Sequence, residues 1–516
     1  MKRLIQLLAL LFILNGCKKN FLDTHPPSNT SPVDLAIPQD SVKLNPSGYA
    51  PLSAIIHYSY SSAGKTKIIV FGKHGANSNI EHMFNDDGLT HAIPVIGLYA
   101  DYNNTVQIIL FDNNNDSIGK SIVHIQTGPL PAALSVSINV DSAHYDNMEP
   151  GLNLVSSRIN YNPRIPYMID DYGDIRWLLD YTSHSALKTL SYDVGISRLR
   201  NGNFFFGDIT TSKIYEVDFF GNILHSWGLS GYIFHHEVME KPNGNFLVCA
   251  TSPSSTHPDG TPTIKDYVLE IDRQTGGIIN TWDLKESLNE YRTTLTTDSK
   301  DWIHINALYY DSTDNTILVS GRTQGVVKLD YNNRVKWILG PHKGWGTNRR
   351  GEQLNQFLLK PLDANGNMIT DTAVIDGYAT ASSFEWNWYQ HCLIKMPNGN
   401  IMMFDNGTSR NYKDSSHYSR AVEYKIDERK MTVQQVWEYG KERGIETYSS
   451  IVSSVQYLPQ TNHILFCPGY KVENTNGFGG KIIEVDYSTK KLIYQSSISS
   501  ENKRGFHRSR RLSAYP

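Results

Sequence analysis

The chain has 516 residues and a formal net charge of -3, with 48 Lys and Arg against 51 Asp and Glu. This balance gives no hint of nucleic-acid binding, because such domains carry clustered positive charge. The length leaves room for two or more domains. The composition, with 30 Tyr, 38 Gly and 22 Pro, favours many short strands joined by turns over long helices.

The N-terminus reads MKRLIQLLALLFILNGCKKN and is typical of an export signal. Lys2 and Arg3 precede an apolar stretch, residues 4–14, that is too short to span a bilayer stably. The following Leu-Asn-Gly-Cys resembles a lipobox; the alternative is an ordinary signal peptide with an incidental cysteine. We therefore expect residues 1–17 to be a lipoprotein-type signal peptide. The mature protein would then be periplasmic, and acylated Cys17 would anchor it to the outer membrane.

Two segments of different character follow the signal. Residues 18–45 are rich in Pro, Ser, Thr and Asp, which predicts a flexible tether. Residues 46–130 contain alternating apolar and polar segments such as TKIIVFG and SIVHIQT, separated by Asn, Asp and Gly clusters. This pattern predicts a small antiparallel β-sandwich domain. A second irregular stretch, about 128–150, is expected to link this domain to the rest of the chain.

From about residue 150 the sequence repeats. Each copy has an apolar residue and an aspartate, then a turn, an apolar strand and an aromatic residue, as in EVDFFGNILHSW and EIDRQTGGIINTW. Six copies predict an all-β fold for residues 150–500, a β-propeller with six four-stranded blades. The spacing is 48 to 59 residues except for one gap of 97, which predicts an insertion at about 340–388. The anchoring aspartates are Asp170, Asp218, Asp272, Asp330, Asp427 and Asp486.

A second motif, Asn-Gly-Asn or a relative of it, opens a strand ahead of the aspartate turn. Asn-Gly supplies the positive φ that a tight hairpin requires, so we expect the strand before it to be the innermost strand of each blade. Two clean copies place a histidine seven residues before the turn, namely His236 and His391. Alignment of the following apolar strands places His304 at the same position, with a longer turn. Equivalent positions in successive blades face one axis, so these histidines are expected to converge.

Three converging imidazoles are compatible with two kinds of chemistry. One is a metal centre with an open position. The other is an anion site in which one histidine attacks and others act as acid and oxyanion donor. Arg322 follows the strand after His304 toward the same end, and Asn306 shares the face of His304. A guanidinium fits a sulfate or phosphate better than a dication, which favours the anion site.

Cysteine usage supports neither a zinc site nor a disulfide framework. Apart from Cys17, the chain has only Cys249, Cys392 and Cys467, which lie in apolar runs without CxxC spacing. We expect them to be buried free thiols.

At this point a family resemblance is apparent. The segments FHHEV, DWIHIN, VSGRTQGVVKLD, QHCLIKMPNGNIMMFDNG and YSRAVEYKID resemble the bacterial aryl-sulfate sulfotransferases that do not use a nucleotide donor. The resemblance covers roughly residues 60–500 and includes HAIPVIGLYADYNNTV in the predicted sandwich. It implies a six-bladed propeller with an N-terminal sandwich, exported to the periplasm. It also implies ping-pong transfer of a sulfuryl group from a phenolic sulfate ester to an acceptor phenol, with no cofactor and no metal.

The same resemblance implies residue roles. His391 would be the nucleophile that is transiently sulfated, while His236, His304, Asn306 and Arg322 would hold the sulfuryl oxygens and move the phenolic proton. Which of His236 and His304 is the acid/base stays open, and a homodimer is an expectation. The alternatives are a propeller lyase or hydrolase with a three-histidine metal centre, and a non-catalytic binding propeller.

Overall fold

The computed structural model describes residues 33–158, 162–191, 195–413 and 417–516. The predicted signal peptide and Cys17 therefore lie outside the described residues. The described chain is mostly β-sheet, which confirms the all-β prediction, and its α-helices are single turns, α1 (Leu284–Ser287) and α2 (Thr372–Ile375). Within this part of the chain, no helix is both long enough and apolar enough to cross a bilayer.

The N-terminal sheet folds on itself as a sandwich. Its central strand β3 pairs with β2 and β5 through its first half and with β4 and β6 through its second half, so it belongs to both layers. Alternate residues of β3 and β6, such as Ile68 and Ile108, are fully buried between the layers. The strands are β1 (Val33–Asp34), β2 (Val42–Leu44), β3 (Ser53–Val70), β4 (Ile80–Met83), β5 (Gly88–Ile96), β6 (Asn103–Phe111) and β7 (Ser117–Gln126).

The tether prediction for residues 18–45 was wrong from residue 33 onward; residues 18–32 lie outside the described part. Strand β1 pairs in parallel with β7, and β2 pairs with β3. Leu35 is buried, and its backbone N–H donates to the Lys120 carbonyl at 2.7 Å. Backbone pairing along an open sheet edge needs little apolar sequence, which is why the composition of this segment did not reveal it.

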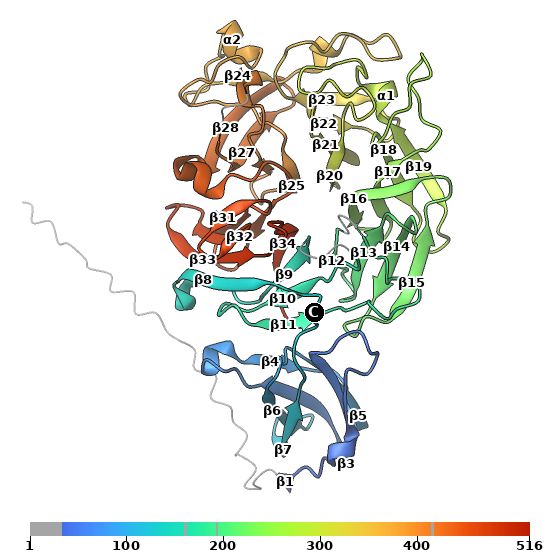
Figure 1. Cartoon of the computed structure of the whole chain (residues 1–516), viewed down its shortest axis with the longest axis vertical. Helices are drawn as coiled ribbons and strands as arrows, with labels where there is room; N and C mark the ends of the chain where they lie inside the picture. Colours follow the sequence, from blue (N-terminus) through green and yellow to red (C-terminus); the bar gives the residue numbers. More distant parts are fainter. Residues whose placement is uncertain (1–32, 159–161, 192–194, 414–416) are drawn as a thin grey trace, which may run out of the picture.

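In the described part of the chain six further sheets follow, and Figure 1 shows them in chain order around a common centre. The first holds β9 (Leu152–Ser157), β10 (Tyr167–Ile169), β11 (Ile175–Leu178) and β34 (Phe506–Leu512). The second holds β12 (Ser197–Arg198), β13 (Phe204–Asp208), β14 (Lys213–Val217) and β15 (Ile223–Gly228). The third holds β16 (Ile233–Glu240), β17 (Phe246–Thr251), β18 (Tyr267–Ile271) and β19 (Ile278–Asp283).

Three more sheets follow along the chain. The fourth holds β20 (Ile305–Asp311), β21 (Thr316–Gly321), β22 (Gly325–Leu329) and β23 (Val335–Leu339). The fifth holds β24 (Lys360–Leu362), β25 (His391–Lys395), β26 (Ile401–Asp405), β27 (Arg420–Asp427) and β28 (Thr432–Tyr439). The sixth holds β8 (Ser137–Ala143), β29 (Ser454–Leu458), β30 (His463–Cys467), β31 (Val472–Asn474), β32 (Gly477–Asp486) and β33 (Leu492–Ser499).

The innermost strands of the sheets surround a central channel. Strand β16 contacts β20, β20 contacts β25, β25 contacts β29 and β29 contacts β34. This agrees with the prediction that the strand before each hairpin is innermost, and the arrangement is propeller-like. All the sheets that follow the N-terminal sandwich contribute to one cavity of about 380 Å³ in the channel, through Ser197, Glu237, Leu308, Cys392, Val455 and Arg510. Cys392 is therefore half-buried, whereas Cys249 and Cys467 are buried, and all three are free thiols.

The repeated aspartate and aromatic residues join neighbouring sheets. In the turn after β14, the Asp218 carboxylate accepts hydrogen bonds from the backbone N–H of Phe220 and Asn222, both at 2.9 Å. The indole N–H of Trp177, at the end of the preceding repeat, donates to the Phe219 carbonyl in that turn at 2.8 Å. Trp227, Trp282 and Trp437 make the same contact to the next turn along the chain. The motif thus encodes the packing of one sheet on the next.

The predicted propeller range, residues 150–500, was too short at both ends. Strand β8, inside the expected linker, pairs with β33 at the edge of the sixth sheet. Strand β34, beyond residue 500, pairs with β9 and supplies the innermost strand of the first sheet. Its sequence FHRSRRL looks exposed, but Arg508 forms a buried ion pair with Glu237 at 2.7 Å. Because the buried arginines of this strand are paired with acidic groups, the strand has no hydrophobic pattern that would predict its burial.

The expected insertion at 340–388 packs on the fifth sheet. Its strand β24 pairs in parallel with the outer strand β28. Trp345, Trp386 and Trp388 are among the largest fully buried side chains of the described chain. The insertion therefore ends in an anchored segment that leads directly into His391.

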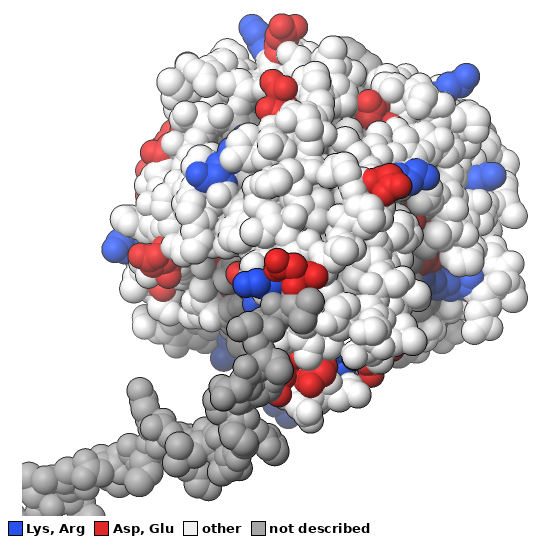
Figure 2. All heavy atoms as spheres, turned by 90° about the horizontal axis from the view of Figure 1, so that it is seen from below, with Lys and Arg blue, Asp and Glu red and all other residues white. Residues whose placement is uncertain are grey.

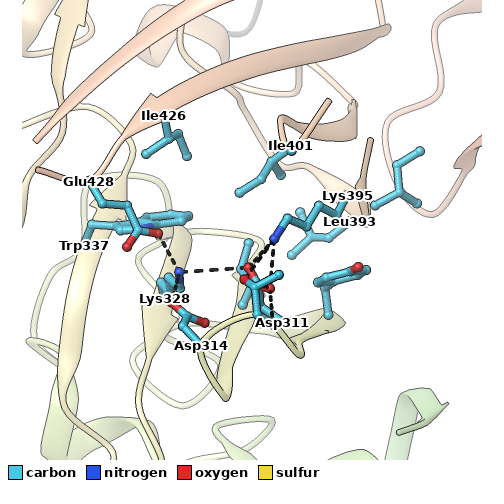
Figure 3. A pocket seen from close by; sticks show the side chains of 14 residues that line it. Asp311, Asp314, Lys328, Trp337, Leu393, Lys395, Ile401, Ile426 and Glu428 are labelled. Carbon is cyan, nitrogen blue, oxygen red and sulfur yellow. Dashed lines mark hydrogen bonds and ion pairs between the residues drawn. The ribbon is translucent and has the colours of Figure 1, made fainter. Parts of the chain in front are cut away.

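Charged side chains are distributed without a dominant sign. Figure 2 shows Lys and Arg mixed with Asp and Glu on the face that it draws. Between the fourth and fifth sheets, Lys328 and Lys395 meet Asp311, Asp314 and Glu428 around a cavity of about 220 Å³ (Figure 3). Each of these five groups has an ionic partner, so the charges around this cavity join the two sheets. It lies at the end of β25 opposite His391.

Candidate active site

The three histidines predicted from the repeat lie on the innermost strands and are buried. His236 is in β16, His304 directly precedes β20, and His391 begins β25. The Nε2 atoms of His236 and His304 are 3.3 Å apart. The charges of Arg322 and His304 act on His391 and lower its pKa, in addition to the larger effect of burial. The structure thus brings these side chains to one end of the central channel.

Irregular backbone lies at or beside each of the three histidines. His236 and His304 have φ values of 54° and 51°, and Cys392, next to His391, has 55°. The strand register shifts at each of these places. A left-handed conformation costs a non-glycine residue on the order of 1–3 kcal/mol, and such strain concentrates at functional sites. The β-bulge re-aims each side chain toward the channel.

The bulge also places His235 beside His236. Regular alternation along a strand would turn His235 toward the neighbouring blade and away from His236. Instead, the two Nδ1 atoms lie 3.2 Å apart, because the left-handed residue interrupts the alternation. His235 therefore contacts the site through His236.

The surroundings of His391 fix its tautomer. Its Nδ1 lies 2.7 Å from Oδ1 of Asn406 and 3.0 Å from the Tyr389 carbonyl. The Asn406 amide donates to the carbonyls of Ser449 and Val452, so its oxygen is the atom that faces the imidazole. Both neighbours of Nδ1 are acceptors, which places the proton on Nδ1 and the lone pair on Nε2. The backbone N–H of Val452 points at this lone pair, at 3.2 Å.

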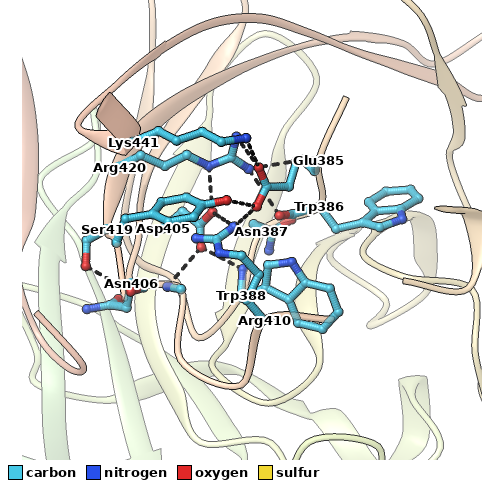
Figure 4. Close-up of polar contacts among 12 residues, drawn as sticks. Glu385, Trp386, Asn387, Trp388, Asp405, Asn406, Arg410, Ser419, Arg420 and Lys441 are labelled. Atoms are coloured by element: carbon cyan, nitrogen blue, oxygen red, sulfur yellow. Dashed lines mark hydrogen bonds and ion pairs between the residues drawn. The ribbon is translucent and has the colours of Figure 1, made fainter. Parts of the chain in front are cut away.

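A buried charge cluster holds the segment that carries His391 (Figure 4). The Arg420 guanidinium donates to the Asp405 carboxylate at 2.8 Å and to the carbonyls of Glu385 and Trp386 at 3.1 Å. The other Asp405 oxygen accepts from the backbone N–H of Trp388 at 2.8 Å. Arg410 pairs with both Asp405 and Glu385. These paired charges attach residues 385–388 to β26 and β27, and so set the start of β25.

His304 is oriented by a carboxylate that sequence patterns did not reveal. Its Nδ1 lies 2.5 Å from Oδ2 of Asp301, and the Lys265 ammonium lies 3.0 Å from the same oxygen. The hydrogen bond to His304 and the nearby positive charges outweigh burial and lower the pKa of Asp301. Asp301 is therefore ionised, and it lies three residues before His304 in the loop that leads into β20.

Arg322 and Asn306 lie beside the histidines. The Arg322 guanidinium lies over the Tyr389 ring at 5.3 Å and 3.9 Å from the Asp301 carboxylate, and its side chain is 21% exposed. Its backbone N–H donates to the His304 carbonyl at 3.1 Å. The Asn306 amide donates to the Gln390 carbonyl at 2.8 Å, one residue before His391. Asn306 thus ties β20 to the start of β25, while Arg322 reaches the partly exposed mouth.

The site keeps its imidazoles neutral. Burial is the largest cause and lowers the pKa of His236 and His391 well below the usual range, and that of His304 to about 4. The positive charge of Arg322 acts in the same direction on His304 and His391. A neutral imidazole has a free lone pair, which both a nucleophile and a general base require.

A fourth histidine was missed. His507 in β34 is buried, and its ring centroid lies 6.0 Å from that of His236. The register of β34 shifts beside it, between Phe506 and Arg508, as it does beside the other three. The repeat could have revealed His507. Strand β34, from the C-terminus, is the innermost strand of the first sheet and carries a histidine beside its register shift, as the other innermost strands with a site histidine do.

The histidines do not have the arrangement of a metal site. Among the residues that the structure describes, no group of three or more His, Cys, Asp or Glu side chains is placed to hold a metal ion. The Nε2 atoms of His236 and His304 face each other, and Nε2 of His391 meets a backbone N–H. This geometry favours the anion site over the three-histidine metal centre.

Comparison with known proteins agrees with these features. Residues 137–508, more than half of the chain, match the family described as Arylsulfotransferase (ASST). The chain belongs to the arylsulfotransferase family. Residues 41–128 match the Arylsulfotransferase Ig-like domain, in agreement with the N-terminal sandwich of this family member.

Two curated relatives extend the match over nearly the whole chain. Arylsulfate sulfotransferase AssT of Escherichia coli O6:H1 (strain CFT073) is 28% identical over 555 residues, covering 90% of this chain and 91% of the relative. Arylsulfate sulfotransferase AssT of Lelliottia amnigena is 28% identical over 567 residues, with the same coverage. The similarity therefore includes the domain order of this arylsulfotransferase as well as its histidine-bearing strands.

Asn406 should control the reactivity of His391. In Asn406→Ala, Nδ1 of His391 loses its closest acceptor and the imidazole no longer has one fixed tautomer, so kcat is expected to fall by about 10²-fold or more. Steady-state transfer assays check this. Asn348→Ala is the matched control, because Asn348 is also buried and donates to a backbone carbonyl, but contacts no histidine. An equal loss of activity in both variants would contradict the positioning role.

Proposed function

We propose that this arylsulfotransferase moves a sulfuryl group from an aryl sulfate ester to an acceptor phenol by a ping-pong mechanism, through a transient sulfohistidine on His391. The observation that carries the proposal is the tautomer of His391. Its Nδ1 faces only acceptors, Asn406 Oδ1 and the Tyr389 carbonyl, and this leaves Nε2 as the nucleophilic atom. The activity named for both relatives supports the same chemistry.

In the first half-reaction, Nε2 of His391 attacks the sulfur of the donor. The N–S bond forms as the bond between sulfur and the aryl oxygen breaks, and its electron pair stays on the leaving phenolic oxygen, which takes up a proton. In the second half-reaction, the acceptor phenol loses its proton as its oxygen attacks sulfur, and the N–S bond electrons return to Nε2. No net proton is consumed, and His391 is regenerated.

The remaining polar groups stabilise the charge on the sulfuryl oxygens. Sulfuryl transfer resembles phosphoryl transfer, in which negative charge spreads over three equatorial oxygens and positioning matters most. Arg322 offers a guanidinium fork at the mouth, and Asn306 offers an amide on the same face as His304. The Val452 N–H donates to Nε2 of His391 at 3.2 Å, and it can donate to a sulfuryl oxygen instead once the N–S bond forms.

Initial-rate kinetics test the mechanism. Varying the donor at several acceptor concentrations should give parallel double-reciprocal lines, and exposure to donor alone should release one phenol per active site in a burst. Intersecting lines together with no burst would exclude a covalent intermediate, and would instead require direct transfer between bound donor and acceptor.

We further propose the architecture and domain limits that go with this function. The six sheets around the channel support a six-bladed β-propeller, as the six repeats predict. The sandwich would correspond to residues 46–130, extended at its start by β1 and β2. The propeller would include β8 at one end and β34 at the other, around the predicted 150–500.

Localisation is proposed from the N-terminal sequence. The apolar stretch and the lipobox-like Leu-Asn-Gly-Cys support a periplasmic enzyme anchored to the outer membrane through acylated Cys17. Cys17→Ser should move the protein from the membrane fraction to the soluble periplasm; unchanged fractionation would argue against the anchor. A homodimer is proposed from the family resemblance, and sedimentation equilibrium of the soluble variant would test it.

A further inference from the structure

We infer that His304 is the acid/base of both half-reactions, that His236 is a fixed hydrogen-bond donor to the same phenolic oxygen, and that Asp301 and His235 set these two roles. The inference rests on the proposed function, because both half-reactions require one proton to move at the phenolic oxygen. Asp301 and His235 act through their neighbours and are positioning residues.

The four side chains form one continuous hydrogen-bonded chain. Oδ2 of Asp301 lies 2.5 Å from Nδ1 of His304. Nε2 of His304 lies 3.3 Å from Nε2 of His236, and the two rings meet nearly edge to face. Nδ1 of His236 lies 3.2 Å from Nδ1 of His235. The three histidines are buried, so bulk water does not compete for these contacts.

Only one arrangement of protons satisfies these three contacts together when the imidazoles are neutral. The ionised Asp301 can only accept, so Nδ1 of His304 carries its proton and Nε2 is bare. Nε2 of His236 must then donate to Nε2 of His304, which leaves Nδ1 of His236 as an acceptor. Nδ1 of His235 supplies the proton for that contact. All the protons in the chain therefore point toward Asp301.

This arrangement gives His236 and His304 different capacities. Nε2 of His236 holds a proton in every state, because His235 occupies its other nitrogen. Nε2 of His304 is the bare atom that faces the site, so it can gain and lose a proton without any change of tautomer. When it is protonated, both Nε2–H groups can donate to one phenolic oxygen. The carboxylate of Asp301 compensates the charge of the imidazolium.

The proton balance follows directly. In the donor half-reaction, the proton on Nε2 of His304 moves to the phenolic oxygen as its bond to sulfur breaks. The bare Nε2 then accepts from His236, which restores the 3.3 Å contact. In the acceptor half-reaction, the acceptor phenol returns a proton to Nε2 of His304 as its oxygen bonds to sulfur. After one transfer cycle and before the next donor binds, this proton stays on the enzyme or exchanges with water.

The charges around His304 fit this role. Burial and the charges of Arg322 and Lys265 lower the pKa of His304, whereas its hydrogen bond to Asp301 raises it, and the balance keeps His304 neutral. An aryl sulfate brings a negative charge, which favours protonation of His304 when the donor binds. Among the described residues, the titratable and charged groups found to interact with His236 or His304 include Asp301, Lys265, Arg322, His235, His391 and His507.

The leaving group provides the test. In Asp301→Asn, the imidazolium of His304 loses its compensating charge and a fixed acceptor at Nδ1. Cleavage of phenyl sulfate should fall by about 10²- to 10⁴-fold, because an unactivated phenolate needs the proton. Cleavage of 4-nitrophenyl sulfate should fall by less than about tenfold, because the nitrophenolate leaves with little help from an acid.

Asp298→Asn is the matched control. Asp298 lies in the same exposed loop and accepts from the backbone N–H of Lys300 and Asp301, but contacts no histidine. Its two cleavage rates should match those of the wild type. If Asp301→Asn lowered the rates of both donors equally, or lowered neither, the inference would be overturned.

A second variant covers the case in which Asp301→Asn does not fold. Lys265 is half-buried, with its ammonium 3.2 Å from Nδ1 of His304, and its positive charge lowers the pKa of His304. In Lys265→Met that pKa rises, so the protonated form persists to higher pH. The fall of phenyl sulfate cleavage with rising pH should therefore move to higher pH. An unmoved profile would contradict His304 as the acid.

The result is separable from a failure of the proposed function. Mass analysis of His391 after exposure to 4-nitrophenyl sulfate reports the covalent step alone, and sulfated His391 should form in Asp301→Asn. If the wild type formed no sulfated His391, the proposed function would fail. If it did form and Asp301→Asn behaved as Asp298→Asn, only the assignment of His304 and Asp301 would fail.

Discussion

Replacing His391 with alanine should abolish sulfuryl transfer, with kcat at least about 10⁴-fold below that of the wild type. Nε2 of this residue is the atom that bonds to sulfur in the proposed mechanism, and the neighbouring histidines cannot substitute. Nε2 of His236 carries a proton that it donates to His304, and Nε2 of His304 is the acid/base at the phenolic oxygen. Initial rates with 4-nitrophenyl sulfate and phenol measure the loss.

The control for this variant is His342, a half-buried histidine. His342 lies in the insertion, and its Nε2 contacts the Leu359 carbonyl at 2.9 Å. His342→Ala removes a similar volume and one hydrogen bond, and should leave kcat near the wild-type value. Transfer that survived in His391→Ala at more than a few per cent of the wild-type rate would assign the nucleophile to another residue.

Replacing Arg322 with methionine should produce the second large effect. Loss of the guanidinium removes charge stabilisation at the sulfuryl oxygens, so kcat/KM for the donor should fall by about 10²- to 10³-fold. Arg322→Lys should recover only part of this, because an ammonium lacks the planar fork. Steady-state assays with donor in excess and limiting amounts separate kcat from KM.

Arg334→Met is the control for charge alone. Arg334 is exposed and pairs with Glu352 at 2.7 Å, away from the histidines. It should retain wild-type kcat/KM. If Arg322→Met retained wild-type activity as well, the sulfuryl oxygens would have to be held by other donors, such as the Val452 N–H.

Much of the propeller-like part was predictable because its repeat encodes packing. Asp218 and its counterparts form the turns, and Trp177 and its counterparts bind the next turn, so the same residues recur in each copy. The strands that were missed lack this signature. Strand β34 buries arginines that are paired with acidic residues, and β1 and β2 are short edge strands held by backbone pairing.

The site was predictable where it follows the repeat and not where it depends on local geometry. His236, His304 and His391 share one repeat position. His507 has the corresponding place in β34, which the structure shows to be part of the first sheet. The contact between His235 and His236 required a left-handed residue that no spacing predicts. Asp301 and Asn406 act through loop contacts that a single sequence does not encode as a pattern.

Intact-protein mass after brief exposure to 4-nitrophenyl sulfate, without acceptor, tests the central proposal most directly. We expect the wild type to gain one sulfuryl group, about 80 Da, located on His391 and lost when phenol is added. His391→Ala should show no gain. Transfer by a wild-type protein that never carries the added mass, or an adduct that persists in His391→Ala, would contradict a covalent mechanism through His391.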